Sequence, residues 1–141
     1  MPEVLIAADA PWVIDQVRAA FTDPDAVVRE VHAGSQVLPA VRDRTPQLVV
    51  LDLQIGNMGG MATCLELRLE EGAGRLPRVA VLMLLDRRAD VFLARRAQAD
   101  GWVVKPLDAI RLRRAIRTLL EGGTYMDESY RPPDVTVAAP S

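Results

Sequence analysis

The 141-residue chain is poor in the residues that build disulfides and metal centres. Its one cysteine, Cys64, excludes an intramolecular disulfide, and together with the one histidine, His32, it cannot form a zinc site of the usual type. The longest apolar run, residues 79–85, is far shorter than a membrane span, and no basic region precedes an apolar stretch near the N-terminus. These absences favour a reduced, cytoplasmic protein without a signal peptide or membrane segment.

The composition is that of one folded domain. Half of the residues are apolar and 26% are charged, and the formal net charge of −2 points to no particular partner. The charge is unevenly spread, because residues 1–86 carry twelve acids and seven arginines, whereas residues 87–117 carry eight arginines and Lys105 against three aspartates. One part of the surface is therefore predicted to be basic.

Short β-branched runs alternate with longer stretches of helical period. Strands are predicted over residues 4–7, 27–31, 48–51, 79–84 and 102–104, and helices over about 11–21, 35–44, 60–71, 88–98 and 108–121. The strands are mostly apolar on both faces, which is typical of a parallel sheet covered by helices on each side. Five such units predict a doubly wound α/β domain over residues 1–121. Residues 122–141 contain Gly-Gly and Pro-Pro without a regular period, and are predicted to be a mostly disordered tail.

Polar residues follow four of the predicted strands: Asp9, Asp52, Asp86 and Lys105. In an open parallel sheet, sites form beyond the carboxyl ends of the strands. Neighbouring carboxylates repel each other unless a cation joins them, and Mg²⁺ is usually held by one or two of them. Taken singly, Asp9 or Asp52 is better read as a turn or cap residue. With Lys105, the only lysine in an arginine-rich chain, they indicate a site for Mg²⁺ and a phosphoryl group.

Three segments, VLIAAD, LVVLDLQIGNMGG and GWVVKPLD, resemble the motifs of the response-regulator receiver family, in the same order and at close to the usual spacing. The resemblance covers residues 3–121 and implies a five-stranded parallel sheet of flavodoxin-like order 2-1-3-4-5 with five helices. It implies that Asp52 accepts a phosphoryl group from a sensor histidine kinase and that Lys105 contacts this group. Asp9, Asp52 and the backbone carbonyl of Gln54 would bind Mg²⁺. The peptide bond between Lys105 and Pro106 would be cis.

The sequence departs from the family pattern at three places. Ala8 stands where the family usually has a second acid, so Mg²⁺ binding is expected to be weak. Residues 83–85 are Met-Leu-Leu, where the family has a threonine or serine whose hydroxyl follows the phosphoryl group. An ungapped count back from the lysine leads to Met83 as the equivalent position, whereas the apolar pattern of the strand leads to Leu85. Trp102 replaces a smaller aromatic residue and is expected to swing inward less easily, although a plain packing residue is at least as good an interpretation.

Two functions remain open. In the first, a single-domain response regulator is phosphorylated on Asp52 and signals to a downstream target through a protein–protein face. In the second, a phosphorylation-independent interaction module (a pseudo-receiver) keeps the fold, as Ala8 and the missing hydroxyl suggest. We favour the first, because Asp9, Asp52 and Lys105 are retained. An enzyme is not expected, because a phosphatase of the haloacid-dehalogenase kind needs an acid where Gln54 stands. A flavin or dinucleotide protein is not expected either, because no glycine-rich or hydroxyl-rich phosphate loop follows the first strand.

The basic residues gather on the last two predicted helices. They are Arg95 and Arg96 on the fourth helix, and Arg111, Arg113, Arg114 and Arg117 on the fifth. In receivers this helix–strand–helix face binds partners or forms homodimers, and a plain solvated face is an equally good interpretation. Nucleic-acid binding is not expected, since neither a reading helix nor stacking aromatic residues accompany the patch.

Overall fold

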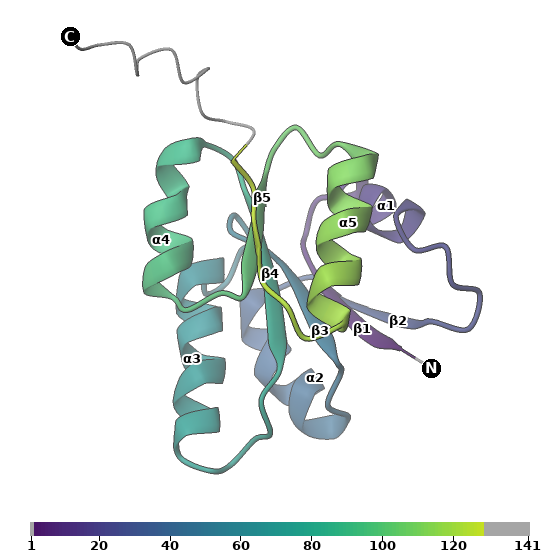
Figure 1. The fold of residues 1–141 in the computed structure, drawn as a ribbon. Coiled ribbons are helices and arrows are strands. Elements are labelled where there is room, and N and C mark those ends of the chain that lie inside the picture. Colours follow the sequence, from purple (N-terminus) through teal and green to yellow (C-terminus); the bar gives the residue numbers. More distant parts are fainter. Residues whose placement is uncertain (1, 129–141) are drawn as a thin grey trace, which may run out of the picture.

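The computed structural model describes residues 2–128, which form one six-stranded parallel sheet flanked by helices (Figure 1). The strand order is β2-β1-β3-β4-β5-β6, so the first five strands have the predicted order 2-1-3-4-5. The strands are β1 (Glu3–Ala7), β2 (Val27–Val31), β3 (Leu48–Asp52), β4 (Ala80–Leu85), β5 (Gly101–Val104) and β6 (Tyr125–Met126).

Five α-helices cover the two faces of the sheet, as predicted. They are α1 (Pro11–Ala19), α2 (Val37–Asp43), α3 (Gly60–Gly72), α4 (Val91–Arg96) and α5 (Ala109–Leu120). Helices α1 and α5 pack on one face, and α2, α3 and α4 pack on the other (Figure 1). Single turns of 3₁₀ helix, η1 (Gly34–Gln36) and η2 (Arg88–Asp90), precede α2 and α4. Helix α4 is therefore shorter than the predicted span of 88–98.

The central strands are apolar over most of their length because each contributes to two cores. In β3, Leu48 and Val50 face the cluster under α1 and α5, whereas Val49 and Leu51 face the cluster under α2 to α4. All four side chains are fully buried. This packing explains why the sequence shows continuous apolar runs where an amphipathic strand would alternate.

The buried side chain of Arg68 links the C-terminal part of α3 to the residues that precede β4 and β5. The guanidinium of Arg68 donates hydrogen bonds to the carboxylates of Glu71 and Asp100 and to the carbonyl of Val79. The same Asp100 carboxylate accepts the backbone N–H of Val81 at 2.7 Å. These bonds fix the amino ends of β4 and β5, at the opposite end of the sheet from Asp52.

Strand β6 adds to the five predicted strands and lies within the segment predicted to be a disordered tail. After α5 the chain turns at Gly122, whose φ is +89°, and runs parallel to β5 with Tyr125 opposite Gly101. Two residues are too few to show a strand period, so the sequence pattern missed them. The rest of the predicted tail, residues 129–141, lies outside the described residues. No helix within residues 2–128 is long and apolar enough to cross a membrane.

Candidate functional site

The carboxyl ends of β3 and β5 bring Asp52 and Lys105 into contact. Asp52 is the last residue of β3 and only 2% exposed, and its Oδ1 lies 3.0 Å from the Nζ of Lys105. The same oxygen accepts the backbone N–H of Gln54 at 3.1 Å. The peptide bond between Lys105 and Pro106 is cis, as predicted. A buried carboxylate of this kind is stabilised by the donors that surround it.

Asp86 also binds Lys105, which the sequence did not reveal. Its Oδ1 lies 2.7 Å from the Nζ of Lys105, so the ammonium bridges the strand ends of β3 and β4. Trp12, from the start of α1, places its ring centroid 5.5 Å from the same Nζ. Burial disfavours the charged form of the lysine, but the hydrogen bonds to Asp86 and Asp52 outweigh this and raise the pKa of Lys105 above its ordinary value. An acid directly after β4 was visible in the sequence, but nothing distinguished it from a turn residue.

Asp9 lies in the loop after β1 and holds the loop after β3. Its Oδ2 accepts the backbone N–H of Gly56 at 3.0 Å, and a Cβ on Gly56 would come within 3.2 Å of that oxygen. Ala8, in contrast, is fully buried in the cluster under α1 and α5. The first strand therefore offers one exposed carboxylate at this edge, where the family usually has two acids.

The oxygen donors at this edge fit a cation that needs few protein ligands. Within residues 2–128, no group of three histidine, cysteine or acidic side chains is arranged to hold a metal ion. The predicted set is the carboxylates of Asp9 and Asp52 with the carbonyl of Gln54. Mg²⁺ commonly keeps several waters and takes one or two carboxylates, so this set suits Mg²⁺ better than a metal that requires three side chains.

The end of β4 is apolar where the family carries a hydroxyl. Residues 83–85 are fully buried, and the carbonyl of Leu85 accepts the backbone N–H of Lys105 at 2.7 Å. Met83, two residues earlier in β4, pairs with Trp102. The structure thus places Leu85, rather than Met83, at the level of the lysine. No hydroxyl is available at either position, as predicted.

Trp102 lies inside the molecule, in agreement with its interpretation as a plain packing residue. Its side chain is 2% exposed and packs in the same cluster as Met83 and Leu85. Its indole Nε1 has no hydrogen-bond partner within the described part of the chain, and the guanidinium of Arg95 lies 5.4 Å from the ring centroid.

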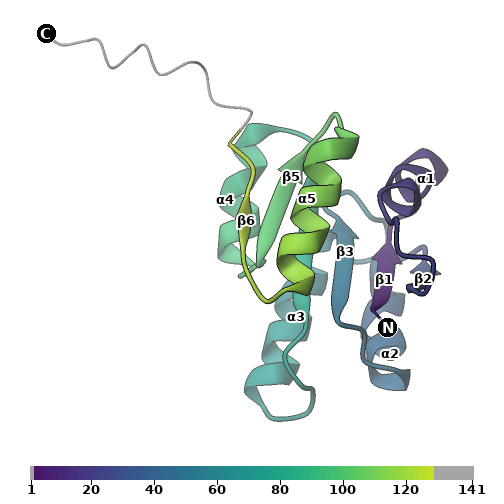
Figure 2. The ribbon, with the colours of Figure 1, turned by 45° about the vertical axis from the view of Figure 1, so that its right-hand side comes forward.

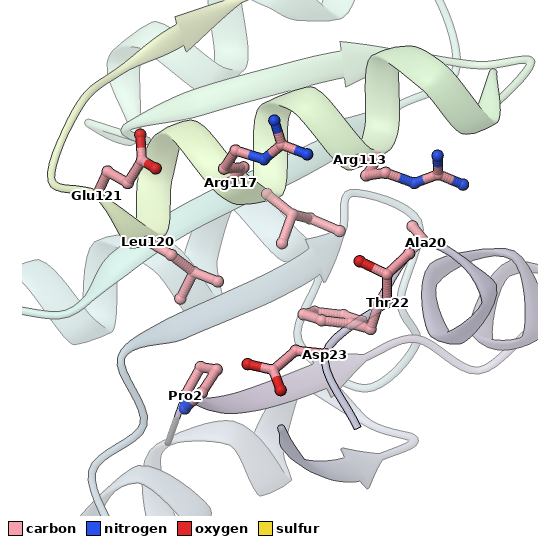
Figure 3. Close-up of a pocket in the computed structure, with 10 residues that line it drawn as sticks. Pro2, Ala20, Thr22, Asp23, Arg113, Arg117, Leu120 and Glu121 are labelled. Atoms are coloured by element: carbon pink, nitrogen blue, oxygen red, sulfur yellow. The ribbon is translucent and has the colours of Figure 1, made fainter. Parts of the chain in front are cut away.

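The predicted basic face is divided among several environments. Arg111 is bound to Asp127 and Asp108, whereas Arg96 lies over the ring of Phe92. Arg113 and Arg117 line a groove of about 270 Å³ between α5 and the connection from α1 to β2 (Figure 3). Pro2, which precedes β1, also lines it, so this groove lies toward the amino ends of the strands and away from Asp52.

A second groove adjoins the predicted site itself. It has a volume of about 470 Å³ and lies between the start of α3 and the η2–α4 segment, lined mainly by apolar groups that include Leu53, Met61 and Leu93. Gln54 and Arg87 stand at its polar rim. A partner in this groove would contact the loops that follow β3 and β4.

A family model described as the response regulator receiver domain matches residues 4–117. The chain is 30% identical over 119 residues to the DNA-binding response regulator MtrA of Mycolicibacterium smegmatis, with 83% of this chain and 50% of MtrA covered. It is 28% identical over 131 residues to the nitrate/nitrite response regulator protein NarL of Escherichia coli K12, with 92% of this chain and 59% of NarL covered. The chain therefore spans about half the length of these curated relatives.

Solved structures show the same fold. A two-component response regulator of the LuxR family from Aurantimonas sp. superposes with a TM-score of 0.75 at 25% identity, covering 97% of this chain and 94% of that one. The chemotaxis response regulator CheY4 of Vibrio cholerae superposes with a TM-score of 0.73 at 19% identity, covering 84% and 98%.

Proposed function

Since this chain belongs to the response regulator receiver domain family, we propose that it accepts a phosphoryl group on Asp52 from the phosphohistidine of a sensor histidine kinase. The observation that carries the proposal is the 3.0 Å contact between the buried carboxylate of Asp52 and the ammonium of Lys105. In the transfer, the P–N bond to the imidazole breaks as a P–O bond to Asp52 forms, and the leaving imidazole takes up a proton.

The two oxygens of Asp52 have different surroundings. Oδ1 is bound by Lys105 and by the backbone N–H of Gln54, which hold the carboxylate in one orientation. We therefore assign the attack on phosphorus to Oδ2. The raised pKa of Lys105 keeps its ammonium charged at neutral pH, so it can neutralise the oxygens of the arriving phosphoryl group.

Asp9, Asp52 and the carbonyl of Gln54 would hold Mg²⁺, which when bound neutralises charge on the phosphoryl oxygens. Asp9 is fixed for this by its hydrogen bond to Gly56, which joins the loop after β1 to the loop after β3. Because Ala8 contributes no carboxylate, Mg²⁺ affinity should be lower than in receivers with two acids there.

The product of the transfer is a signal rather than a released compound, so we propose a cytoplasmic regulatory protein and not an enzyme. Its partners would be a sensor kinase and a downstream target protein, with the α4–β5–α5 face as a surface for the target or a second copy. We propose no nucleic-acid contact for this domain.

A phosphorylation-independent interaction module is the second candidate. It is favoured by the apolar end of β4 and by the buried position of Trp102. In that case the ion pair between Asp52 and Lys105 would stabilise the fold, and the partner-binding surface would keep a single conformation.

The experiment that separates the two is intact mass after incubation with Mg²⁺ and acetyl phosphate. A single adduct of one phosphoryl group in the wild type, absent from Asp52→Asn and absent when EDTA removes Mg²⁺, supports the receiver function. A folded wild type that takes up no phosphoryl group from acetyl phosphate or from a mixture of phosphorylated histidine kinases would favour the second candidate.

A further inference from the structure

Strand β6 occupies the open edge of β5, immediately beside the backbone that carries Lys105. In Figure 2 it lies next to β5 between α4 and α5. The approach is close, since a Cβ on Gly101 would come within 2.6 Å of the carbonyl oxygen of Tyr125. A glycine at position 101 is thus required for this pairing.

One buried carboxylate anchors this strand. The side chain of Asp127 is 1% exposed, and its Oδ2 accepts the backbone N–H of Val104 at 2.9 Å and the guanidinium of Arg111 at 2.7 Å. Its own N–H donates to the carbonyl of Trp102. A carboxylate this far from solvent is tolerated only where charged and polar donors are arranged around it. Asp127 therefore joins three elements, β5, α5 and the chain after β6.

The position of these bonds relates the C-terminal segment to the site. Val104 directly precedes Lys105, and Trp102 lies two residues before Val104 on the same strand. On an edge strand, the N–H of Val104 would otherwise face solvent. The bond to Asp127 instead fixes the backbone from which the Lys105 side chain reaches Asp52 and Asp86.

We propose that Asp127 is a positioning residue for Lys105. The segment from Gly122 to Asp127 would then hold the β5 backbone that carries Lys105 in the phosphoryl-accepting site. The inference deepens the proposed function, on which it rests. A small displacement of a group that neutralises charge can lower binding of the charged ligand strongly. Coupling of this kind is reciprocal, so a phosphoryl group at Asp52 should in turn hold β6 more firmly on β5.

Two variants disturb the anchor in different ways. Asp127→Ala removes the carboxylate, and Gly101→Ala leaves it intact but forces the Tyr125 backbone away from β5. Asp127→Asn keeps an oxygen that can accept the N–H of Val104 while losing the ion pair with Arg111, so it should recover part of the wild-type behaviour. The matched control is Asp108→Asn, because Asp108 lies 3.6 Å from the same Arg111 and belongs to neither β5 nor β6. Asparagine also serves as an N-cap for α5.

The first measurement is the affinity for beryllofluoride in the presence of Mg²⁺, followed by tryptophan fluorescence in a Trp102→Phe background, in which the signal comes from Trp12 beside Lys105. We expect Asp127→Ala and Gly101→Ala to weaken binding about tenfold, and Asp108→Asn to bind as the wild type does. Urea unfolding of each variant shows that it is folded under the conditions of the titration.

The second measurement does not depend on phosphorylation. Lys105 is the only lysine of the chain, so its acetylation by a limiting amount of acetic anhydride is read by mass spectrometry at a single side chain. Its side chain is 12% exposed, and release of β6 should raise its acetylation rate severalfold in Asp127→Ala and Gly101→Ala but not in Asp108→Asn.

The two measurements separate the outcomes. A wild type that does not bind beryllofluoride refutes the proposed function, and the acetylation rates then still decide whether Asp127 positions Lys105. Unchanged acetylation rates in both anchor variants overturn the inference. So does unchanged beryllofluoride affinity in both variants when the wild type binds.

Discussion

Leu85 offers a direct test of how the site would respond to a hydroxyl. It is the last residue of β4, it is fully buried, and its carbonyl accepts the backbone N–H of Lys105. Leu85→Thr places a hydroxyl on the strand at the level of the lysine. Leu85→Val is its matched control, because valine has a methyl group where threonine has the hydroxyl and both side chains have nearly the same volume.

The expected stabilities follow from the buried, apolar surroundings. Shortening Leu85 to valine removes one buried methylene and should lower the free energy of unfolding by about 1 kcal/mol. The neighbours of Leu85 in the core include Met83 and Trp102, which offer no good acceptor to a hydroxyl. Leu85→Thr should therefore be less stable than Leu85→Val by about 2 kcal/mol, within the usual range for an unpaired buried hydroxyl.

Binding of a phosphoryl mimic should offset part of this difference. A phosphoryl mimic on Asp52 offers the hydroxyl an acceptor, so Leu85→Thr should bind beryllofluoride with Mg²⁺ about tenfold more tightly than Leu85→Val, equal to about 1.4 kcal/mol. Urea unfolding measures the first difference, which corresponds to about 1 M in midpoint for a domain of this size. Equal affinities of the two variants for the mimic would show that Leu85 does not face the bound group. Equal stabilities would refute the argument from burial.

Three further outcomes are expected. Asp86→Asn should tighten beryllofluoride binding by about fivefold, because Asp86 competes for Lys105 with a bond of about 1 kcal/mol at a partly exposed site; weaker binding in a titration would show that Asp86 orients the lysine instead. Hydrogen bonds from Arg75 and, to a smaller extent, Arg42 lower the pKa of Glu70 from 4.5 to about 2. The stability that Glu70 contributes is therefore present above pH 4.5 and lost as the pH falls toward 2. The difference in urea midpoint between wild type and Glu70→Gln should shrink between pH 4.5 and 2 and stay constant above pH 4.5. Burial raises the pKa of Cys64 to about 11, so its thiol should react with iodoacetamide at pH 8 only after unfolding, and rapid labelling of the folded protein would contradict its burial.

The sequence predicted the parts of the fold that depend on continuous apolar runs. Strands such as β3 are buried on both faces over their whole length, so composition alone marks them. Helix α4 was predicted too long because its first turn is the 3₁₀ segment η2, in which Asp90 rather than an apolar residue faces inward. A hydrophobic period does not register a turn that is held by a polar side chain.

Three strand-end residues, Asp9, Asp52 and Lys105, could be chosen from the sequence, since parallel strands bring their carboxyl ends to one edge. Asp86 also follows a strand, but its contact with Lys105 could not be assigned from the sequence, and neither could the contacts of Asp127. The contact between Asp86 and Lys105 depends on the path of the loop after β4. The contacts of Asp127 depend on the two-residue strand β6, which can pair with β5 because Gly101 has no side chain. Such contacts depend on backbone geometry between distant segments, which no local pattern records.

The family residues that this chain retains at the site differ in role from those that it lacks. In the proposed function, Asp9, Asp52 and Lys105 would serve the uptake of a phosphoryl group, and all three are present at one edge of the sheet. The hydroxyl at the end of β4, which in the family follows the phosphoryl group, is absent, and Trp102 is already buried. If Asp52 is phosphorylated, the change must then reach the surface by another connection. Lys105 supplies one, because it is bound to Asp52 at its ammonium and adjoins Val104, whose N–H is held by Asp127 against Arg111 of α5. On this argument β6 and α5, rather than β4, carry the response to the outer face.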